Sequence, residues 1–406
     1  MQRQPYDHYR NLLATLASDT IPLDVLAEVG QRYGWWQPQR VWQRTYGRFQ
    51  LGDEPLVTLI YETLDLPQQL CVINLYTAFP NAFALCQAVA HHDPLGWFCV
   101  TRFPYDPLLP TLPTALALPG QPKVLRYRPG KRCTIRFVGG SADAPNDGPI
   151  PARFAKVFSD DRGAAIYRES QALWAASQAG VLDFAVARPI SWQEGLQTLW
   201  QGAVPGAPVV DRLLSAEGPA LAERLGRAAA SLTHADLQPQ QRTDGRKQQK
   251  RSTKYVERLC TFFPTLTPAL EWLLDRLTAV HTESDPTRLR PIHGAPHPHQ
   301  WLNDGTRLGL VDFDGFALGD PELDVATFMA EMDFEDWESA PVAAINARFQ
   351  AGYEAVAGPL DERLLNAYRT HKRLSKALRN AYAVRADNDM RVERAVGQAL
   401  TLAMQL

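Results

Sequence analysis

The sequence predicts an α+β protein of two lobes preceded by an N-terminal extension, and three observations indicate this fold class. The chain has 406 residues, more than one hydrophobic core usually organises, so two lobes or domains are expected. Its 45% hydrophobic and 21% charged residues are typical of an ordinary globular protein. Short β-rich segments are concentrated before residue 203, and amphipathic helical patterns dominate after it.

Residues 1–122 predict helices followed by short strands. Leucine and valine recur at helical spacing over residues 6–33, with Pro22 suited to the first turn of a second helix. A helix is also predicted over 80–90, before a proline-rich connector at 103–113. We interpret this part as an extension that packs against or caps the rest. Segments rich in β-forming residues predict strands at 47–51, 56–61 and 70–75.

Residues 123–202 predict a small antiparallel sheet that begins with a cationic hairpin. A strand, a Pro129-Gly130 turn and a second strand fill residues 123–138, and Lys131 and Arg132 adjoin the turn. Cations and backbone N–H groups at such a turn bind phosphates. An exposed hairpin with solvated charges fits the same pattern.

A lysine lies inside the next strand, and a helix that carries a glutamate follows it. Lys156 falls within the apolar strand 153–157, where an unpaired ammonium group would be costly to bury. Glu169 lies on an apolar face of the helix predicted at 161–179. Taken alone, the two positions also fit a surface lysine and an ordinary helical glutamate. Two more strands, at 185–190 and 197–201, complete the sheet.

Residues 203–406 predict a mainly helical lobe. Glycine, alanine and proline at 202–206 are typical of a linker. The polar, basic stretch 238–254 predicts a loop whose charges favour a solvated surface; the alternative is attraction of an anionic substrate or tail. Helices are predicted at 209–214, 219–237, 255–281 and 361–406.

The stretch 291–326 combines a short hairpin with a concentration of polar groups. Asn303-Asp304-Gly305 predicts a tight turn between two apolar runs, because Asp-Gly tolerates the positive φ of such turns. The hairpin therefore brings together the two segments at its open end, which suggests a site. One end carries His293, His297, His299 and Gln300, and the other carries Asp312, Phe313 and Asp314.

This stretch resembles the catalytic segment of the aminoglycoside phosphotransferase and choline kinase family, whose members are relatives of the protein kinases. That family carries H-G-D-x-x-x-x-N, a hairpin, D-F or D-x-D, and then G-D-P-x-x-D. Two positions differ, because Ala295 stands at the catalytic aspartate and Gln300 at the metal-binding asparagine. The matching residues are His293-Gly294, Asp312-Phe313-Asp314, Gly319-Asp320-Pro321 and Asp324.

The resemblance implies a two-lobed protein-kinase-like fold after the extension at 1–122. The small antiparallel-sheet N-lobe would cover 123–202, and the mainly helical C-lobe would cover 203–406, with the catalytic hairpin at 291–326. The linker at 202–206 would then be the hinge whose backbone edge receives the adenine.

The resemblance also implies that ATP and Mg²⁺ are the cofactors. Lys156 and Glu169 match a lysine–glutamate pair that holds the α- and β-phosphates. Lys131 and Arg132 are further candidates to face the nucleotide phosphates.

Three residues are implied as metal ligands. Asp312 offers the hard carboxylate oxygens that Mg²⁺ prefers, and Asp314 is a candidate second ligand. Gln300 presents the same amide oxygen as asparagine, one methylene farther out.

Ala295 leaves the usual position of the general base without a proton acceptor. Loss of a general base costs on the order of 10²–10⁴ in rate. His297 is a candidate substitute base, and a structural role within His297-Pro298 is the alternative. A zinc site formed by the three nearby histidines is disfavoured, because they lack helical register and no cysteine is near.

The remaining residues of the motif are interpreted as scaffold. His293 is expected to hydrogen-bond backbone near Asp312. Asp320 and Asp324 are expected to cap the helix after Pro321 and to anchor the catalytic segment.

Two functions from different classes are therefore predicted. The first is a phosphotransferase that binds ATP and Mg²⁺ and phosphorylates a hydroxyl group of an unknown small-molecule acceptor, with weakened catalysis. The alternative is an inactive pseudokinase, a nucleotide- or ligand-binding module that regulates a protein partner. A third hypothesis is nucleotidyl transfer from a nucleotide bound in a flipped orientation.

Charge, cysteine usage and hydropathy favour a cytoplasmic protein. The net charge of −2 gives no reason to expect a nucleic-acid partner. The five cysteines are odd in number and lack C-x-x-C pairing, so free thiols in a reducing compartment are expected rather than disulfides. No apolar run approaches the ~18 residues of a membrane span, and the N-terminus lacks a signal pattern.

Overall fold

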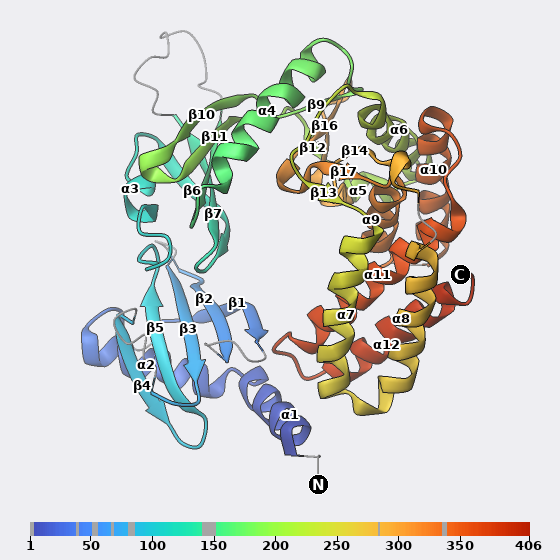
Figure 1. Cartoon of the computed structure of the whole chain (residues 1–406). Helices are drawn as coiled ribbons and strands as arrows, with labels where there is room; N and C mark the ends of the chain where they lie inside the picture. The colour runs from blue at the N-terminus through green and yellow to red at the C-terminus, as the bar shows by residue number, and fades with distance from the viewer. Residues whose placement is uncertain are drawn as a thin grey trace.

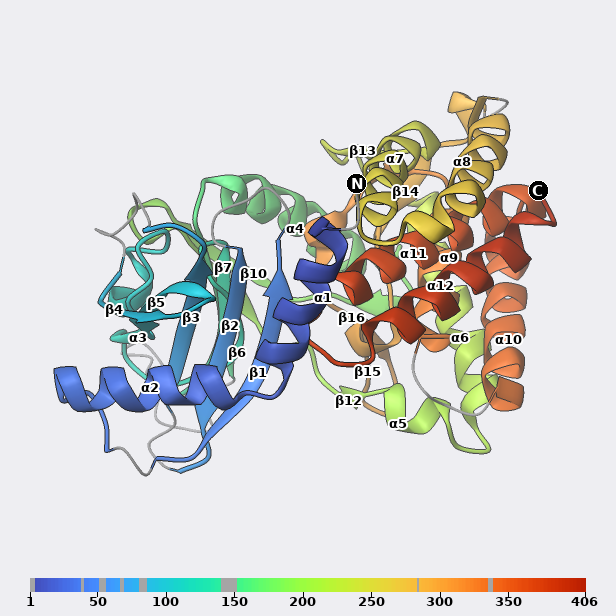
Figure 2. The same ribbon diagram turned by 90° about the horizontal axis from the view of Figure 1, so that it is seen from below.

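The protein consists of two β-sheet parts and one helical part (Figure 1, Figure 2). The computed structural model describes residues 4–37, 40–50, 56–65, 69–79, 86–139, 152–282, 285–334 and 339–406. In Figure 1 the N-terminal sheet lies at lower left, the second sheet at upper left, and most helices lie on the right. Among the described helices, none is long and apolar enough to span a lipid bilayer.

The N-terminal part is a five-stranded antiparallel sheet preceded by two helices. The helices α1 (Gln4–Ala17) and α2 (Thr20–Tyr33) confirm the helical prediction for this region. The sheet has the order β1-β2-β3-β5-β4, and its middle strands are almost fully buried. Its strands are β1 (Trp42–Phe49), β2 (Val57–Thr63), β3 (Leu70–Tyr76), β4 (Ala88–His92) and β5 (Gly96–Arg102).

The helix predicted over 80–90 is wrong where the structure describes this segment. Ala88, Val89 and Ala90 belong to β4 and pair with β5, and residues 80–85 lie outside the described residues. A short run of small apolar residues fits either a strand or a helix, and here pairing with a neighbouring strand decides.

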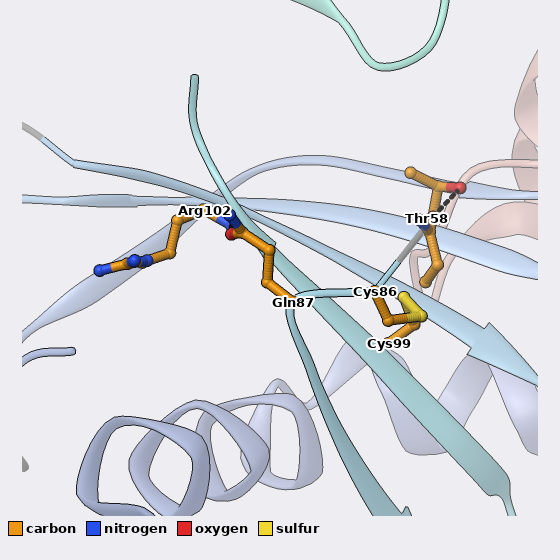
Figure 3. The surroundings of a disulfide bond; sticks show 6 residues. Thr58, Cys86, Gln87, Cys99 and Arg102 are labelled. Carbon is orange, nitrogen blue, oxygen red and sulfur yellow. Dashed lines mark hydrogen bonds between the residues drawn. A yellow bond between two sulfur atoms is a disulfide. The ribbon is translucent and has the colours of Figure 1, made fainter. Parts of the chain in front are cut away.

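A disulfide joins Cys86 to Cys99, so the expectation of free thiols is wrong for this pair (Figure 3). The two Cα atoms lie 5.4 Å apart, within the range that a disulfide spans. The cysteines are 13 positions apart in the sequence, and the β4–β5 hairpin brings them together. Their spacing alone did not indicate this proximity. Cys71 and Cys133 are buried free thiols, and Cys260 is a partly exposed one.

The second sheet confirms the predicted small antiparallel sheet. Its order is β10-β11-β8-β7-β6, and α4 (Arg162–Gln178) follows β8 in the chain. The strands are β6 (Gln121–Arg128), β7 (Arg132–Val138), β8 (Arg153–Phe158), β10 (Pro189–Gln193) and β11 (Thr198–Gly202).

One face of this sheet packs against an apolar core, and the other face carries cationic residues. Alternate residues of β7 and β8, such as Cys133, Ile135 and Val157, are buried in a core with Leu112 of α3 (Leu112–Leu116). Successive strand residues point to opposite faces, so the residues between them, Arg132 and Lys156 included, lie on the other face.

The helical part surrounds two small sheets that carry strands of the segment 291–326. The sheet β12-β15-β16-β9 contains the predicted hairpin, and the sheet β13-β17-β14 lies next to it in the fold. The short strands are β9 (Phe184–Ala185), β12 (Ala207–Pro208), β13 (Arg242–Thr243), β14 (Arg290–Ile292), β15 (Trp301–Asn303), β16 (Leu308–Leu310) and β17 (Ala317–Gly319). The helices are α5 (Val210–Leu213), α6 (Gly218–Ser231), α7 (Gly245–Phe262), α8 (Thr267–Thr282), α9 (Glu322–Met332), α10 (Ser339–Ala357), α11 (Glu362–Ala381) and α12 (Asn388–Ala403).

The loop predicted at 238–254 is in large part the first half of α7. Asp244 caps this helix, because its side chain accepts a hydrogen bond from the N–H of Lys247 at 3.0 Å. Gly245, Gln248 and Ser252 form its buried face at helical spacing. The exposed face carries most of the charge, so the polar composition of the stretch did not reveal that it forms an amphipathic helix.

The N-terminal part contacts both other parts. The N–H of Phe49 in β1 donates to the carbonyl of Tyr382 at 2.8 Å, and Arg10 of α1 forms an ion pair with Asp389. Asp106 accepts hydrogen bonds from Tyr127 and from the N–H of Gly130 in the second sheet, at 2.8 and 2.7 Å. The extension therefore bridges the second sheet and the helices.

Candidate active site

The hairpin of β15 and β16 is built as predicted and sets the position of the site. Leu302 lies opposite Gly309, and Gly305 in the turn has a positive φ of 99°. Asp304 fixes the turn by accepting hydrogen bonds from the N–H groups of Thr306 and Arg307 at 2.8 and 2.7 Å. The open end of the hairpin therefore holds the segments around residues 300 and 312 side by side.

Two aspartates and two cations meet at that open end. The Lys156 Nζ atom lies 2.6 Å from Oδ1 of Asp312 and 2.6 Å from Oδ1 of Asp314. Arg132 forms an ion pair with Asp314 and lies 3.8 Å from Oδ2 of Asp312. These four side chains, which we call the ion-pair network, join the second sheet to the end of the β15–β16 hairpin.

The backbone of Asp312 is in the left-handed region, at φ 70° and ψ 54°. A non-glycine residue rarely adopts this conformation, and such outliers cluster at functional sites. The conformation turns the chain directly after β16, so that the carboxylates of Asp312 and Asp314 both reach Lys156.

The pKa values of Lys156 and Asp312 are shifted in the directions that favour their charged forms. Burial alone would lower the pKa of Lys156, but Asp314 and Asp312 raise it above its ordinary value. Burial alone would raise the pKa of Asp312, but Lys156 and Arg132 hold it well below its usual range. Two positive and two negative charges therefore balance at neutral pH.

Gln300 lies beside this network and provides an unused oxygen. Its side chain is buried, and its Nε2 atom lies 3.4 Å from Oδ2 of Asp312. Its Oε1 atom is buried without a hydrogen-bond partner. A buried, unsatisfied oxygen on a residue that contacts the Asp312 carboxylate fits a hard divalent cation. Within the described residues, no three His, Cys, Asp or Glu side chains form a metal-binding group, so this donor set depends on Gln300.

The segment that contains the substituted position 295 is held rigidly. The Asp324 carboxylate accepts hydrogen bonds from the N–H groups of His293 and Gly294, each at 2.8 Å. The Nε2 atom of His293 lies 3.1 Å from the carbonyl oxygen of Val311. Gly294 has a φ of 83°, and a Cβ atom there would lie 2.3 Å from the carbonyl oxygen of Gly315. The anchoring role of Asp324 and the scaffold role of His293 are therefore confirmed.

Helix capping by Asp320 and Asp324 is wrong. The helix α9 has no side-chain hydrogen bond at its N-cap, which is Pro321. Asp320 instead binds the hydroxyl of Tyr368 in α11, and Asp324 is occupied by the backbone of the catalytic segment. Burial raises the pKa of Asp324 to about 7.

Ala295 and His297 lie on the segment where the sequence analysis expects the general base. The N–H of Ala295 donates to Nδ1 of His293 at 3.3 Å, and its methyl group accepts no proton. His297 is partly buried, and its Nδ1 atom has no hydrogen-bond partner. Burial lowers the pKa of His297, against the opposing charges of Glu331 and Asp312, so the ring is neutral at pH 7. A neutral imidazole near Asp312 is able to accept a proton.

Comparison with known proteins decides the family. Residues 148–365, more than half of the chain, match the model of the phosphotransferase enzyme family. The chain belongs to that family. No curated protein matches this phosphotransferase.

Solved structures share the fold at low sequence identity. A candidate aminoglycoside phosphotransferase from Ralstonia eutropha is 17% identical, with a TM-score of 0.52 over 73% of this chain and 98% of that one. A choline/ethanolamine kinase family protein from Mesorhizobium loti is 15% identical, with a TM-score of 0.50 over 73% of this chain and 97% of that one. The predicted kinase-like α+β fold is thus confirmed.

The phosphotransferase does not form the predicted Lys156–Glu169 pair. The Oε1 atom of Glu169 accepts the N–H of Gln240 at 2.9 Å, whereas Lys156 is paired with the two aspartates. The buried face of α4 runs through Ile166 and Ser170, which leaves Glu169 at its border. Glu169 thus connects α4 to the segment before β13.

The two cations at the β6–β7 turn have different surroundings. Arg132 belongs to the ion-pair network, but Lys131 is exposed, and among the described residues only its backbone forms hydrogen bonds, with Arg128 and Ser159. Sequence reasoning placed Arg132 near phosphates and missed its contact with Asp314. The alternation of cations along β6 and β7 was the signal for a cationic sheet face.

Proposed function

We propose that this phosphotransferase binds ATP and Mg²⁺ and transfers the γ-phosphoryl group to a hydroxyl of a small molecule. Catalysis is weakened because residue 295 is an alanine. The observation that carries the proposal is the meeting of Lys156 with Asp312 and Asp314 at the open end of the hairpin. Phosphoryl transfer requires mainly positioning and charge stabilisation, which such a site is suited to supply.

The cationic side of the network supports nucleotide binding. Lys156 and Arg132 lie on one face of adjacent strands, where two positive charges would meet the phosphates. The linker between β11 and β12, at 203–206, would leave a backbone edge for the adenine. ATP would replace the carboxylates as partners of Lys156 and Arg132, at least in part.

Asp312, Asp314 and Gln300 would hold Mg²⁺. When bound, Mg²⁺ would neutralise charge on the phosphates. When Lys156 and Arg132 turn toward ATP, Asp312 and Asp314 lose their positive partners, and Mg²⁺ would replace them. Metal and nucleotide should therefore bind together.

The reaction transfers one group and releases one proton. The acceptor oxygen bonds to the γ-phosphorus, the bond from that phosphorus to the β–γ bridging oxygen breaks, and ADP leaves with the electron pair. The acceptor's hydroxyl proton goes to the neutral imidazole of His297 or to water. His297 supports this role by its low pKa and its unpaired nitrogen.

A pseudokinase is the second candidate. Ala295 and the charge-balanced ion-pair network favour it, because a site that satisfies itself without ligands needs neither metal nor substrate to be stable. Such a protein would bind nucleotide or another ligand and regulate a partner protein without turnover.

Release of ADP from ATP in the presence of Mg²⁺ tests the choice. The proposal expects slow release in the wild type and a loss of at least about tenfold in Lys156→Met, since a charge-assisted phosphate contact accounts for about that factor. The matched control is Lys123→Met, because Lys123 of β6 is exposed and has no side-chain partner among the residues that the structure describes. Nucleotide binding without any ADP release, in the presence of diverse hydroxyl compounds, would favour the pseudokinase.

A further inference from the structure

We propose that Asp106 of the N-terminal extension is a positioning residue for nucleotide binding, because its carboxylate holds the turn between β6 and β7 that leads to Arg132. This inference rests on the proposed function and gives the extension a role in it. Three observations support it. They are the hydrogen bonds of the carboxylate, its burial without a cation, and the attachment of the extension to the helical part.

The carboxylate of Asp106 binds both the end of β6 and the turn that follows. Its Oδ2 atom accepts hydrogen bonds from the hydroxyl of Tyr127 at 2.8 Å and from the N–H of Gly130 at 2.7 Å. Tyr127 is the penultimate residue of β6, and Gly130 lies in the turn with a φ of 67°. One oxygen atom therefore fixes the strand and the turn relative to each other. Figure 1 shows this turn at the end of the second sheet that faces the N-terminal sheet.

These contacts reach the turn from the face of the sheet opposite to the ion-pair network. Tyr127 pairs in register with Cys133, and both contribute to the apolar core of this sheet. Arg132 precedes Cys133 in β7, so its side chain points to the other face, where it forms an ion pair with Asp314. Asp106 thus supports the turn from behind and acts on the site only through it.

Asp106 is a buried carboxylate without a cationic partner. Only 7% of the residue is exposed, and no lysine, arginine or histidine of the described residues forms an ion pair with it. Its Oδ1 atom accepts a hydrogen bond from the N–H of Leu108 at 3.0 Å. A buried charge without a cation is costly, and an apolar side chain would fill the same space more favourably. What the carboxylate adds is a hydrogen-bonded connection between its own segment and the turn.

The connector that carries Asp106 is held in place by its own backbone and by the core. The N–H of Asp106 donates to the carbonyl of Pro104 at 3.0 Å, and the N–H of Leu109 donates to the carbonyl of Asp106 at 2.9 Å. Leu109 and Leu112 are fully buried in the core of the second sheet. The carboxylate is therefore presented to the turn from a fixed position.

The extension is also attached to the helical part. The N–H of Phe49 in β1 donates to the carbonyl of Tyr382 at 2.8 Å, and the N–H of Val384 donates to the carbonyl of Gly47 at 3.3 Å. From β1 the N-terminal sheet leads through β5 to the connector. The extension therefore connects the β6–β7 turn to the helical part by a route separate from the linker between β11 and β12.

This second connection holds the turn before any nucleotide binds. The apparent affinity of a ligand falls with the fraction of molecules that are in the binding-competent conformation. With the turn held by Asp106, Arg132 already lies beside Asp314, so binding does not include the entropy loss of ordering a free turn. The expected effect of Asp106 is thus on nucleotide affinity rather than on the chemical step.

The test compares the binding of AMP-PNP, a non-hydrolysable ATP analogue, to variants of the full chain in the presence of Mg²⁺. Asp106→Ser keeps an oxygen for the N–H of Leu108 but is one bond shorter, so it loses the contacts with the turn. Calorimetric titration should show roughly tenfold weaker binding of AMP-PNP. Asp106→Asn keeps an acceptor for the N–H of Gly130 and should bind AMP-PNP within about threefold of the wild type.

Thr111→Val is the matched control. It removes another hydrogen bond between the connector and the second sheet, from Oγ1 of Thr111 to the carbonyl of Leu196 at 2.9 Å, and leaves the β6–β7 turn untouched. Its AMP-PNP affinity should stay within about twofold of the wild type. A second measurement needs no nucleotide. Hydrogen exchange of the Gly130 amide should be about tenfold faster in Asp106→Ser than in the wild type.

The outcomes separate this inference from the proposed function. Wild-type affinity in Asp106→Ser would overturn the inference, and so would an equal loss of affinity in Thr111→Val, which would indicate a structural role only. A loss in Asp106→Asn as large as in Asp106→Ser would overturn it as well, since the asparagine keeps the contact. Failure of the wild type to bind AMP-PNP would contradict the proposed function itself, and the exchange of Gly130 would then still decide whether Asp106 holds the turn.

Discussion

Lys156 of β8 and Asp312 after β16 are 156 positions apart in the sequence, yet Nζ and Oδ1 lie 2.6 Å apart. This contact joins the second sheet to the end of the β15–β16 hairpin. The ammonium that would hold ATP phosphates is thus partnered by the carboxylate that would hold the metal. Binding of ATP and Mg²⁺ would exchange this internal pair for ligand contacts, which is the centre of the proposed function.

Asp312→Ala should abolish Mg²⁺-dependent nucleotide binding. The substitution removes the carboxylate closest to Gln300 and one of the two anions at Lys156. Even outer-shell partners of a metal cost about 10–100-fold in affinity, so loss of a direct ligand should cost at least that much. ATP titrations with and without Mg²⁺ measure the effect, with Asp275→Ala at an exposed position of α8 as control. Unchanged binding would remove Asp312 from the site.

Ala295→Asp should raise the rate of phosphate transfer or of ATP hydrolysis. The new carboxylate would supply a proton acceptor on the segment that Asp324 holds, and a general base accounts for on the order of 10²–10⁴ in rate. Steady-state release of ADP measures the gain. Ala295→Asn, of nearly equal size but without a basic group, should not reproduce it. A rate equal to that of the wild type would mean that the site differs from an active one at more than this residue.

Acid should destabilise the protein through a buried histidine pair in the helical part. Nε2 of His281 lies 2.7 Å from Nε2 of His371, and Oγ of Ser252 lies 2.6 Å from Nδ1 of His371. Burial lowers the pKa of His281 to about 4 and the pKa of His371 well below its ordinary value. Between about pH 6.5 and pH 4 the unfolded chain therefore binds protons that the folded chain does not, and the free energy of unfolding falls as pH falls through this window.

His281→Gln should flatten this dependence, by up to about 1.4 kcal/mol per pH unit for the one proton removed. Urea unfolding at several pH values between 4.5 and 7.5 measures the slope. His234→Gln, an exposed histidine of the same lobe, is the control. An unchanged slope in His281→Gln would show that other groups produce the acid sensitivity.

Cys86→Ser should destabilise the N-terminal part under oxidising conditions only. The disulfide to Cys99 closes a loop of 13 positions, for which loss of the constraint on the unfolded chain corresponds to about 3 kcal/mol. Urea unfolding with and without dithiothreitol compares the variant with the wild type, and Cys260→Ser serves as control. Equal stability of wild type and variant without reductant would show that the bond contributes nothing in solution.

Much of the fold could be predicted because its signals are local. Turn chemistry at Asp304-Gly305 and alternation along β7 and β8 are properties of a few adjacent residues, and both are present in the structure. The resemblance of 291–326 to a known catalytic segment added the two-lobed architecture. His293 has the predicted scaffold role, and Asp324 has the predicted anchoring role but does not cap the helix after Pro321.

The predictions that proved wrong depend on contacts between segments distant in the sequence, or on a helix whose buried face is partly polar. Because an unpaired buried ammonium is costly, Lys156 was rightly expected to have a partner. The sequence favoured the nearby Glu169, whereas the actual partners are aspartates that only the folded hairpin brings close. The Cys86–Cys99 bond likewise depends on strand pairing. In α7, Gln248 and Ser252 occupy the buried face, so hydrophobicity alone did not mark the helix.

The most direct test of the central claim is calorimetric titration of the purified protein with ATP, with and without Mg²⁺. The proposed function predicts saturable binding that depends on Mg²⁺, because the ligands exchange partners with Lys156, Asp312 and Asp314 together. Absence of ATP binding in the presence of Mg²⁺ would contradict it and would leave the kinase-like lobes as a scaffold for another partner.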